Sequence, residues 1–159
     1  MRPIRIAPAD NQSVARHELG AYLATQPGIT IIGEAASGEE ALHHASDWQA
    51  DVIVMDILAP GGIDGIETTR RLKRLLPQTQ IVILSGYADD AWIIGTLRAG
   101  AIMHVEKNSQ PEQLLEAVRS AKPCSSHRLC NGSFRRRRCG MATRSPNARG
   151  TCRACWRRG

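Results

Sequence analysis

Four polar residues stand where short apolar runs of the sequence end. Asp56 comes straight after the apolar residues VIVM, Asp10 follows the first apolar run, Ser85 follows IVIL directly, and Lys107 comes two residues after MHV. An unpaired buried carboxylate is costly, so Asp56 either ends a strand or has a chemical role. Carboxylates hold hard divalent cations, a hydroxyl and an ammonium group can receive phosphoryl oxygens, and a carboxylate can act as nucleophile. The set therefore favours phosphoryl transfer onto Asp56, if the fold gathers these side chains.

The elements that would gather them can be read from the hydrophobic pattern. Short apolar runs alternate with amphipathic stretches of helical period, which predicts an α/β fold with five parallel strands and five helices. Right-handed crossovers place the C-terminal ends of parallel strands at one edge of the sheet, where ligands bind in open α/β folds. The four polar residues are expected at that edge. The apolar runs cover residues 4–6, 29–32, 52–55, 81–84 and 103–105.

Helix boundaries are marked by capping residues and by helix breakers. A side-chain oxygen three positions before a glutamate is typical of a helix start, and this pattern occurs at Ser37, Asp64 and Ser109. Residues that end a helix follow the first, third and fourth predicted helices: Pro27, Pro77 and Gly100.

The charge distribution divides the chain in two. Residues 1–121 contain ten basic and 15 acidic residues and carry a net charge of −5, whereas residues 122–159 contain 11 arginines and lysines, no acid and all five cysteines. The overall charge of +6 therefore averages two different compositions. No apolar run approaches the roughly 18 residues of a membrane span, and the N-terminal residues lack the apolar stretch of a signal peptide. We expect a cytoplasmic protein that does not enter a membrane.

Taken in order, the segments IRIAPADN, VIVMDILAPGGIDGIETTRRLK, IVILSG and LRAGAIMHVEK resemble the receiver domains of bacterial two-component response regulators. Within that family the sequence is most similar to the NarL/FixJ type, whose output domain is of the LuxR type. The resemblance spans residues 4–121 and implies a receiver domain over residues 1–121. The implied fold is flavodoxin-like (CheY-like), a doubly wound five-stranded parallel sheet with strand order 2-1-3-4-5 and five helices.

The resemblance also implies roles for individual residues. Asp56 would be the phospho-acceptor, Ser85 the switch hydroxyl and Lys107 the lysine that pairs with the phosphoryl group. Asp10, Asp56 and the carbonyl of Leu58 would bind Mg²⁺. The phosphoryl donor would be a sensor histidine kinase, and the protein would be a phosphorelay component in transcription regulation rather than an enzyme.

Some positions depart from the family pattern. Asn11 stands where the family usually has a second acid, so it can offer a neutral oxygen to the metal but removes one charge, and we expect weaker Mg²⁺ binding. Pro8 lies within the first strand, where it deletes a hydrogen bond of the ladder. The loop APGGID is one residue longer than the common form. His104 occupies the place where many receivers have an aromatic switch residue, and we assign it no chemistry.

Two other functions compete with a phosphorylated switch. A pseudo-receiver would keep the fold and act through protein contacts without phosphate, which Asn11 and Pro8 favour and the joint presence of Asp56, Ser85 and Lys107 disfavours. A phosphatase of the haloacid dehalogenase kind would need a second acid two residues after Asp56, and the sequence there is DIL. We further expect a homodimer through the fourth helix, fifth strand and fifth helix, because Trp92 looks exposed.

Residues 122–159 allow four interpretations. They could form an arginine-rich nucleic-acid arm, a zinc site at the single CxxC motif, or a disordered basic tail. The fourth interpretation is an out-of-frame translation, beginning near residues 121–124, of a helix-turn-helix output domain. Back-translated and read one base earlier, SPNARGTCRACWRRG permits LTERE followed by LLA, as in the output domains of NarL/FixJ regulators. The hypothesis predicts a tail without zinc or specific DNA binding, and hence a receiver that has lost its output.

Overall fold

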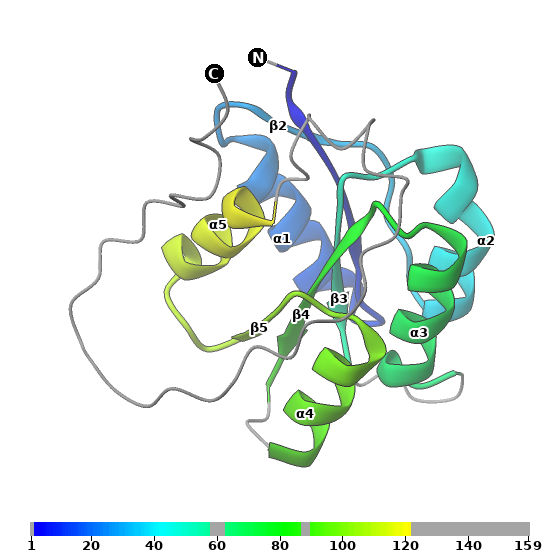
Figure 1. Ribbon diagram of the computed structural model, residues 1–159. Helices are drawn as coiled ribbons and strands as arrows, with labels where there is room; N and C mark the ends of the chain where they lie inside the picture. Colours follow the sequence, from blue (N-terminus) through cyan, green and yellow to red (C-terminus); the bar gives the residue numbers. More distant parts are fainter. Residues whose placement is uncertain (1, 58–62, 87–89, 122–159) are drawn as a thin grey trace, which may run out of the picture. The chain divides into compact units, whose positions relative to one another are not determined.

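The computed structural model describes residues 2–57, 63–86 and 90–121, and strands and helices alternate along them (Figure 1). The predicted alternation of five strands and five helices is confirmed within these residues. Leu58 and the whole of residues 122–159 lie outside them, so the predictions for that carbonyl and for the tail stay predictions. The elements are β1 (Ile4–Ala9), α1 (Ser13–Ala24), β2 (Ile29–Ile31), α2 (Gly38–Trp48), β3 (Val52–Asp56), α3 (Gly65–Leu75), β4 (Gln80–Ser85), α4 (Asp90–Ala99), β5 (Met103–Glu106) and α5 (Pro111–Ser120).

The strands form one parallel sheet in the order β2-β1-β3-β4-β5, as the resemblance implied. The central strand β3 pairs with β1 on one side and with β4 on the other, and Val54 lies opposite both Pro8 and Val82. All five residues of β3 are buried. Because β3 is covered on both faces, its sequence is a continuous apolar run that ends at Asp56.

Helices cover both faces of the sheet and bury a separate core on each. In Figure 1, α1 and α5 lie on one side of the sheet, and α2, α3 and α4 lie on the other. Successive residues of a strand point to opposite faces, so Val52 and Val54 pack with α1 and α5, and Ile53 and Met55 pack on the opposite side. Among the described residues, no helix has the length and apolar character that a membrane crossing requires.

Pro8 is buried within β1, in the middle of the sheet, as expected. Its carbonyl accepts a hydrogen bond from the backbone N–H of Ala35 at 3.0 Å. The N–H and C=O of one strand residue point to the same side, so the donor that Pro8 lacks would face the segment after β2, which ends at Ile31. The missing hydrogen bond therefore falls beyond the regular β1–β2 ladder, and the pairing of β1 with β3 is unaffected.

Two of the three predicted helix caps are confirmed and one is wrong. Ser37 accepts from the backbone N–H of Glu40 at 3.1 Å, and Asp64 accepts from that of Glu67 at 2.7 Å. The third cap was expected at Ser109, but α5 begins at Pro111, and the Ser109 hydroxyl donates to the Glu106 carbonyl at 2.7 Å. A residue that precedes proline is disfavoured in helical conformation, so the helix cannot start earlier than Pro111.

The predicted helix ends agree with the structure. Pro27 and Pro77 follow α1 and α3, and Gly100 follows α4 with a φ of +112°. That left-handed conformation is strained for residues with a side chain, which explains why glycine ends this helix.

Candidate functional site

The parallel sheet brings the four predicted polar residues to one edge. Asp56 and Ser85 are the last residues of β3 and β4, Asp10 follows β1 directly, and Lys107 follows β5 directly. The backbone N–H of Lys107 donates to the carbonyl of Ser85 at 2.8 Å, which fixes the end of β5 against the end of β4. The predicted site residues therefore lie on adjacent strand ends.

Lys107 joins the two acids of the site. Its Nζ lies 2.7 Å from Oδ2 of Asp10 and 2.9 Å from Oδ2 of Asp56. Both aspartates are buried, at 4 % and 8 % exposure. Burial by itself would lower the pKa of Lys107, but the hydrogen bonds and charges of Asp10 and Asp56 outweigh it and raise that pKa above 10.5. At neutral pH an ammonium group therefore holds the two carboxylates together.

The backbone around Asp10 is fixed by further hydrogen bonds. Oδ1 of Asp10 accepts from the N–H of Gln12 at 2.8 Å, and its carbonyl accepts from the Arg16 guanidinium at 2.5 Å. Its own N–H donates to the carbonyl of Ala35 at 3.0 Å. These contacts leave Oδ2 of Asp10 directed at Lys107, so the position of this carboxylate is set before any ligand binds.

A small hollow beside Asp56 is the place where a cation and a phosphoryl group could bind. Asn11 is exposed and lies on the wall of this hollow, next to Asp10. The oxygens of Asp10 and Asp56 already hold one cationic group between them, the ammonium of Lys107, and such oxygen ligands suit Mg²⁺. The donor set therefore fits a hard divalent cation. The hollow is lined by Ala9, Asp10, Asn11, Ser37, Gly38, Met55, Asp56, Ile63, Gly65 and Thr68.

The replacement of the second acid by Asn11 is visible in the charge of the site. Over residues 2–57, 63–86 and 90–121, no group of three or more acidic, histidine or cysteine side chains could hold a metal. Among the described residues that line the hollow there are two carboxylates, Asp10 and Asp56, and one amide, Asn11. This donor set agrees with the predicted loss of charge, and weaker Mg²⁺ binding stays a prediction.

Sequence reasoning missed the part of the hollow that α2 and α3 build. A Cβ atom on Gly38 would lie 2.3 Å from Oγ1 of Thr68, and one on Gly65 would lie 2.9 Å from Cα of Ile57. Both helices therefore begin at a glycine that allows close packing beside the site. The only available signal was the position of each glycine directly after a capping residue, which also suits an ordinary helix start.

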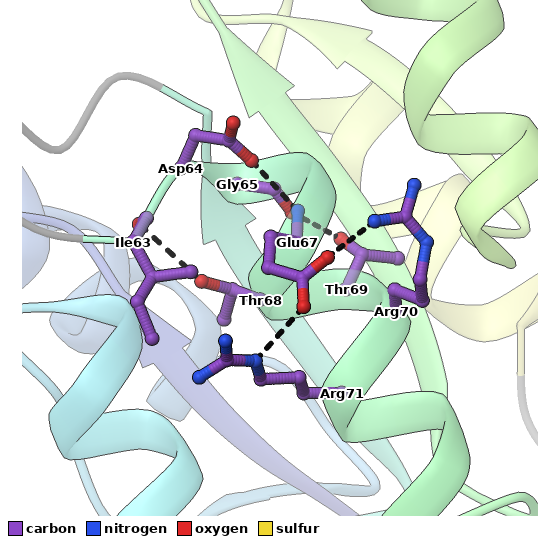
Figure 2. A network of polar contacts seen from close by, with 8 residues as sticks. All are labelled: Ile63, Asp64, Gly65, Glu67, Thr68, Thr69, Arg70 and Arg71. Carbon is purple, nitrogen blue, oxygen red and sulfur yellow. Dashed lines mark hydrogen bonds and ion pairs between the residues drawn. The ribbon is translucent and has the colours of Figure 1, made fainter.

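The first turn of α3 is held by its own polar network (Figure 2). Glu67 pairs with Arg70 and with Nε of Arg71, the latter at 2.9 Å, and the Thr69 hydroxyl donates to the Gly65 carbonyl at 2.6 Å. The pKa of Glu67 is lowered, mainly by the side-chain hydrogen bonds from Arg71 and Arg70. The network stiffens the helix start that faces the hollow.

His104 lies in β5, at the position where an aromatic switch residue was expected from the resemblance. Within the described part of the chain its Nε2 is buried without a hydrogen-bond partner. Burial lowers the pKa of His104, and the nearby charge of Glu106 opposes that effect in part. The lowered pKa favours the neutral ring at physiological pH, and the assignment of no chemistry to His104 stays a prediction.

Comparison with known proteins gives a family match over most of the chain. The family model described as the response regulator receiver domain matches residues 6–119. The transcriptional regulatory protein LiaR of Bacillus subtilis is 36 % identical over 118 residues, which are 74 % of this chain and 56 % of LiaR. The response regulator protein VraR of Staphylococcus aureus is 33 % identical over 116 residues, 73 % of this chain and 55 % of VraR. The chain thus spans about half the length of these curated relatives.

Solved structures agree with the sequence matches. A LuxR-family two-component response regulator from Aurantimonas is 29 % identical with a TM-score of 0.70, and the match covers 74 % of this chain and 84 % of that one. The response regulator domain of Thermotoga maritima CheB is 30 % identical with a TM-score of 0.69, covering 76 % of this chain and 96 % of that one. The observed fold is therefore shared with chains of related sequence.

Proposed function

Because this chain belongs to the response regulator receiver domains, we propose that it is the receiver of a phosphorelay and accepts a phosphoryl group on Asp56. The observation that carries the proposal is the bridge from Lys107 to Asp10 and Asp56. One lysine bridges two buried carboxylates at the strand ends, and we propose that the carboxylate of Asp56 acts as the nucleophile.

In the proposed reaction an Oδ atom of Asp56 attacks the phosphorus of the donor. A bond forms between that oxygen and phosphorus, the bond from phosphorus to the donor breaks, and its electron pair leaves with the donor. Such loose transition states need positioning and charge neutralisation more than covalent assistance. Lys107 supplies a fixed positive charge next to Asp56 and so offsets charge on the phosphoryl oxygens.

Asp10, Asp56, Asn11 and the carbonyl of Leu58 are the residues that we propose to hold Mg²⁺. The oxygen ligands support this assignment, and Leu58 lies outside the described residues. When bound, the metal would supply positive charge for the phosphoryl oxygens. With Asn11 in place of an acid, the chain would hold the metal with one charge fewer.

Ser85 is proposed as the switch hydroxyl. It is buried at the end of β4 and its carbonyl accepts from the N–H of Lys107. Phosphorylation adds about −1.5 to −2 charges at Asp56. A Ser85 hydroxyl that moves to bond the new oxygens would draw the end of β4 with it, which is a population shift between two packings of β4 and α4.

The proposed partner is a sensor histidine kinase in the cytoplasm, since the relatives that this chain matches include response regulators. We propose that the tail, residues 122–159, is out of frame and that DNA-binding output has been lost. The nucleotide sequence tests this: a frame one base back that meets a stop codon, or encodes nothing like a helix-turn-helix, returns the basic-arm interpretation.

A pseudo-receiver is the second candidate, and it is favoured because the described residues offer no group of three or more acidic, histidine or cysteine side chains for a metal. Incubation with acetyl phosphate and Mg²⁺, followed by intact mass spectrometry, separates the two functions. We expect a gain of one phosphoryl group in the natural chain and in Asp47→Asn, whose exposed aspartate lies in α2 away from the site, and no gain in Asp56→Asn. A chain that never gains mass would be a pseudo-receiver.

A further inference from the structure

Ile63 lies between Asp56 and α3, and both of its peptide groups are held by neighbouring helices. Its backbone N–H donates to Oε1 of Glu39, in the first turn of α2, at 2.6 Å. Its carbonyl accepts from the hydroxyl of Thr68, in α3, at 3.5 Å, a contact drawn in Figure 2. The contact from Glu39 is the shorter, and it reaches Ile63 from a different helix.

Ile63 is part of the wall of the hollow that holds Asp56, together with Gly38 and Thr68. It directly precedes Asp64, the residue that caps α3. A displacement of Ile63 would therefore change both the wall beside Asp56 and the start of α3. Glu39 does not line the hollow, so its effect on the site passes through Ile63.

The electrostatics of Glu39 agree with this contact. The hydrogen bond from the Ile63 N–H is the largest cause of a lowered pKa of Glu39, and the charge of Arg71 adds to it. The carboxylate is therefore ionised throughout the neutral range, and hydrogen bonds to a charged acceptor are stronger than those to a neutral one.

We propose that Glu39 is a positioning residue that, by holding Ile63, keeps water away from the phosphorylated Asp56 and so lengthens the life of the phospho-form. The proposal rests on the proposed function. In the step that it slows, a water oxygen bonds to phosphorus and the bond between phosphorus and the Asp56 oxygen breaks. The products are inorganic phosphate and the free carboxylate, and the proton of the water passes to solvent.

The chain offers a matched control in the neighbouring Glu40. Both glutamates lie in the first turn of α2 and interact alike with its helix dipole. Glu40, however, accepts from the N–H of Ala36 at 2.6 Å and not from Ile63. Glu40→Ala therefore reports the cost of a weaker helix start, and only Glu39→Ala removes the contact to Ile63.

The experiment has two arms, both on the full chain. The first measures hydrogen exchange at the Ile63 amide without phosphate, and the second measures the decay of phospho-Asp56 after loading with acetyl phosphate and Mg²⁺. Glu39→Ala should exchange Ile63 faster and shorten the phospho-form's life by about fivefold, a typical effect of one lost hydrogen bond. Glu39→Gln keeps an acceptor oxygen, so it should restore most of both properties, and Glu40→Ala should change neither.

If the Ile63 amide exchanges at the same rate in Glu39→Ala as in the natural chain, Glu39 does not hold Ile63 and the proposal is wrong. If the Ile63 amide exchanges faster but the lifetime of phospho-Asp56 is unchanged, Glu39 has no positioning role in the site. Equal loss in Glu40→Ala and Glu39→Ala assigns the effect to the helix start and overturns the proposal. A natural chain that takes no phosphoryl group overturns the proposed function and with it the effect on lifetime, while the exchange arm still tests the contact.

Discussion

The central residue of the site is Lys107, because its charge lets two buried aspartates lie side by side. Its side chain is 22 % exposed, and the side chains of Asp10 and Asp56 are 3 % and 6 % exposed. A buried charge that loses its partner is strongly destabilising. The ammonium therefore serves stability in the resting protein and phosphoryl transfer in the proposed reaction.

Removing the ammonium group of Lys107 should destabilise the fold, and bound Mg²⁺ should restore part of the lost stability. We expect Lys107→Met to lower the free energy of unfolding by about 2–3 kcal/mol, allowing for screening by solvent. Mg²⁺ should recover part of this loss because a cation again separates the two carboxylates. Lys73→Met is the control, since Nζ of Lys73 donates to the carbonyls of Pro77 and Thr79 and not to acids. Urea unfolding with and without Mg²⁺ measures both, and an equal Mg²⁺ effect in the two variants would contradict the account.

The pH dependence of this stabilisation follows from the raised pKa of Lys107. A lysine whose folded pKa is raised contributes its full stability below the unfolded value of about 10.4 and loses it as pH rises through the folded pKa. The difference in unfolding free energy between the natural chain and Lys107→Met should therefore be constant from about pH 7 to 9 and shrink above about 10.5. A difference that stays constant or grows as the pH rises past about 10.5 would count against the raised pKa.

Asn11 sets the charge available to the metal. We expect half-maximal phosphorylation by acetyl phosphate to need Mg²⁺ on the order of millimolar concentration, and Asn11→Asp to lower that requirement by restoring a charged ligand. Asn11→Ser, which restores no charge, is the matched control. A Mg²⁺ titration of the phosphorylated fraction that is the same for Asn11→Asp and the natural chain would exclude Asn11 from the metal site.

At the level of elements, the close approach of α2 and α3 builds the wall of the site. Gly38 packs against Thr68, and Ile63 joins the two helices through Glu39 and Thr68. This pairing could not be predicted from the sequence, because Glu39 and Ile63 are 24 positions apart and no spacing rule connects them. Asp10, Asp56, Ser85 and Lys107 could be predicted, because a parallel sheet must gather its strand ends.

The strands and helix starts show where a sequence pattern is reliable. The central strands are buried on both faces, so their apolar runs marked them to within a residue, whereas β1 extends to Ala9 through small residues that carry little hydrophobic signal. The prediction of a helix cap at Ser109 was wrong because it rested on the spacing to Glu112 alone. Pro111 disfavours a helical conformation in the residue before it, so α5 begins at Pro111.

The packing of Gly38 gives a prediction at this scale. In Gly38→Ala the new Cβ would meet Oγ1 of Thr68, so we expect a loss of about 1–3 kcal/mol in the free energy of unfolding. Thr68→Ala in the same chain should relieve part of that loss. Gly86→Ala is the control, since a Cβ there meets nothing within 4 Å. Thermal unfolding compares the variants, and equal stability of Gly38→Ala and Gly86→Ala would contradict the packing.

At the scale of the whole molecule, the resemblance to receiver domains, which was inferred from the order of short motifs along the sequence, is confirmed by the comparisons with known proteins. Trp92, whose apparent exposure supported the expected homodimer, is half-buried against the core. Its indole is large and apolar, and α4 turns it toward the sheet. The exposed apolar side chains near α4 are instead Ile94, Leu97 and Ile102, each 44–49 % exposed.

Self-association on phosphorylation stays a proposal for the face formed by α4, β5 and α5. The exposed Ile94 and Leu97 support it, because apolar side chains gathered on one face favour contact with a partner. Sedimentation should show a larger mass for the phosphorylated chain, and Leu97→Glu should abolish the increase. Leu75→Glu, at an exposed position in α3, should leave it intact. Identical masses with and without phosphate would remove the proposal.

The central claim, that Asp56 accepts the phosphoryl group, is tested most directly by locating the modified residue. Borohydride reduces an aspartyl phosphate to homoserine, and peptide sequencing by mass spectrometry then identifies the position. After loading with acetyl phosphate and Mg²⁺, we predict homoserine at position 56 and at no other aspartate. Homoserine at Asp10, Asp51 or Asp64 instead, or none in a chain that is shown to be folded, would contradict the account.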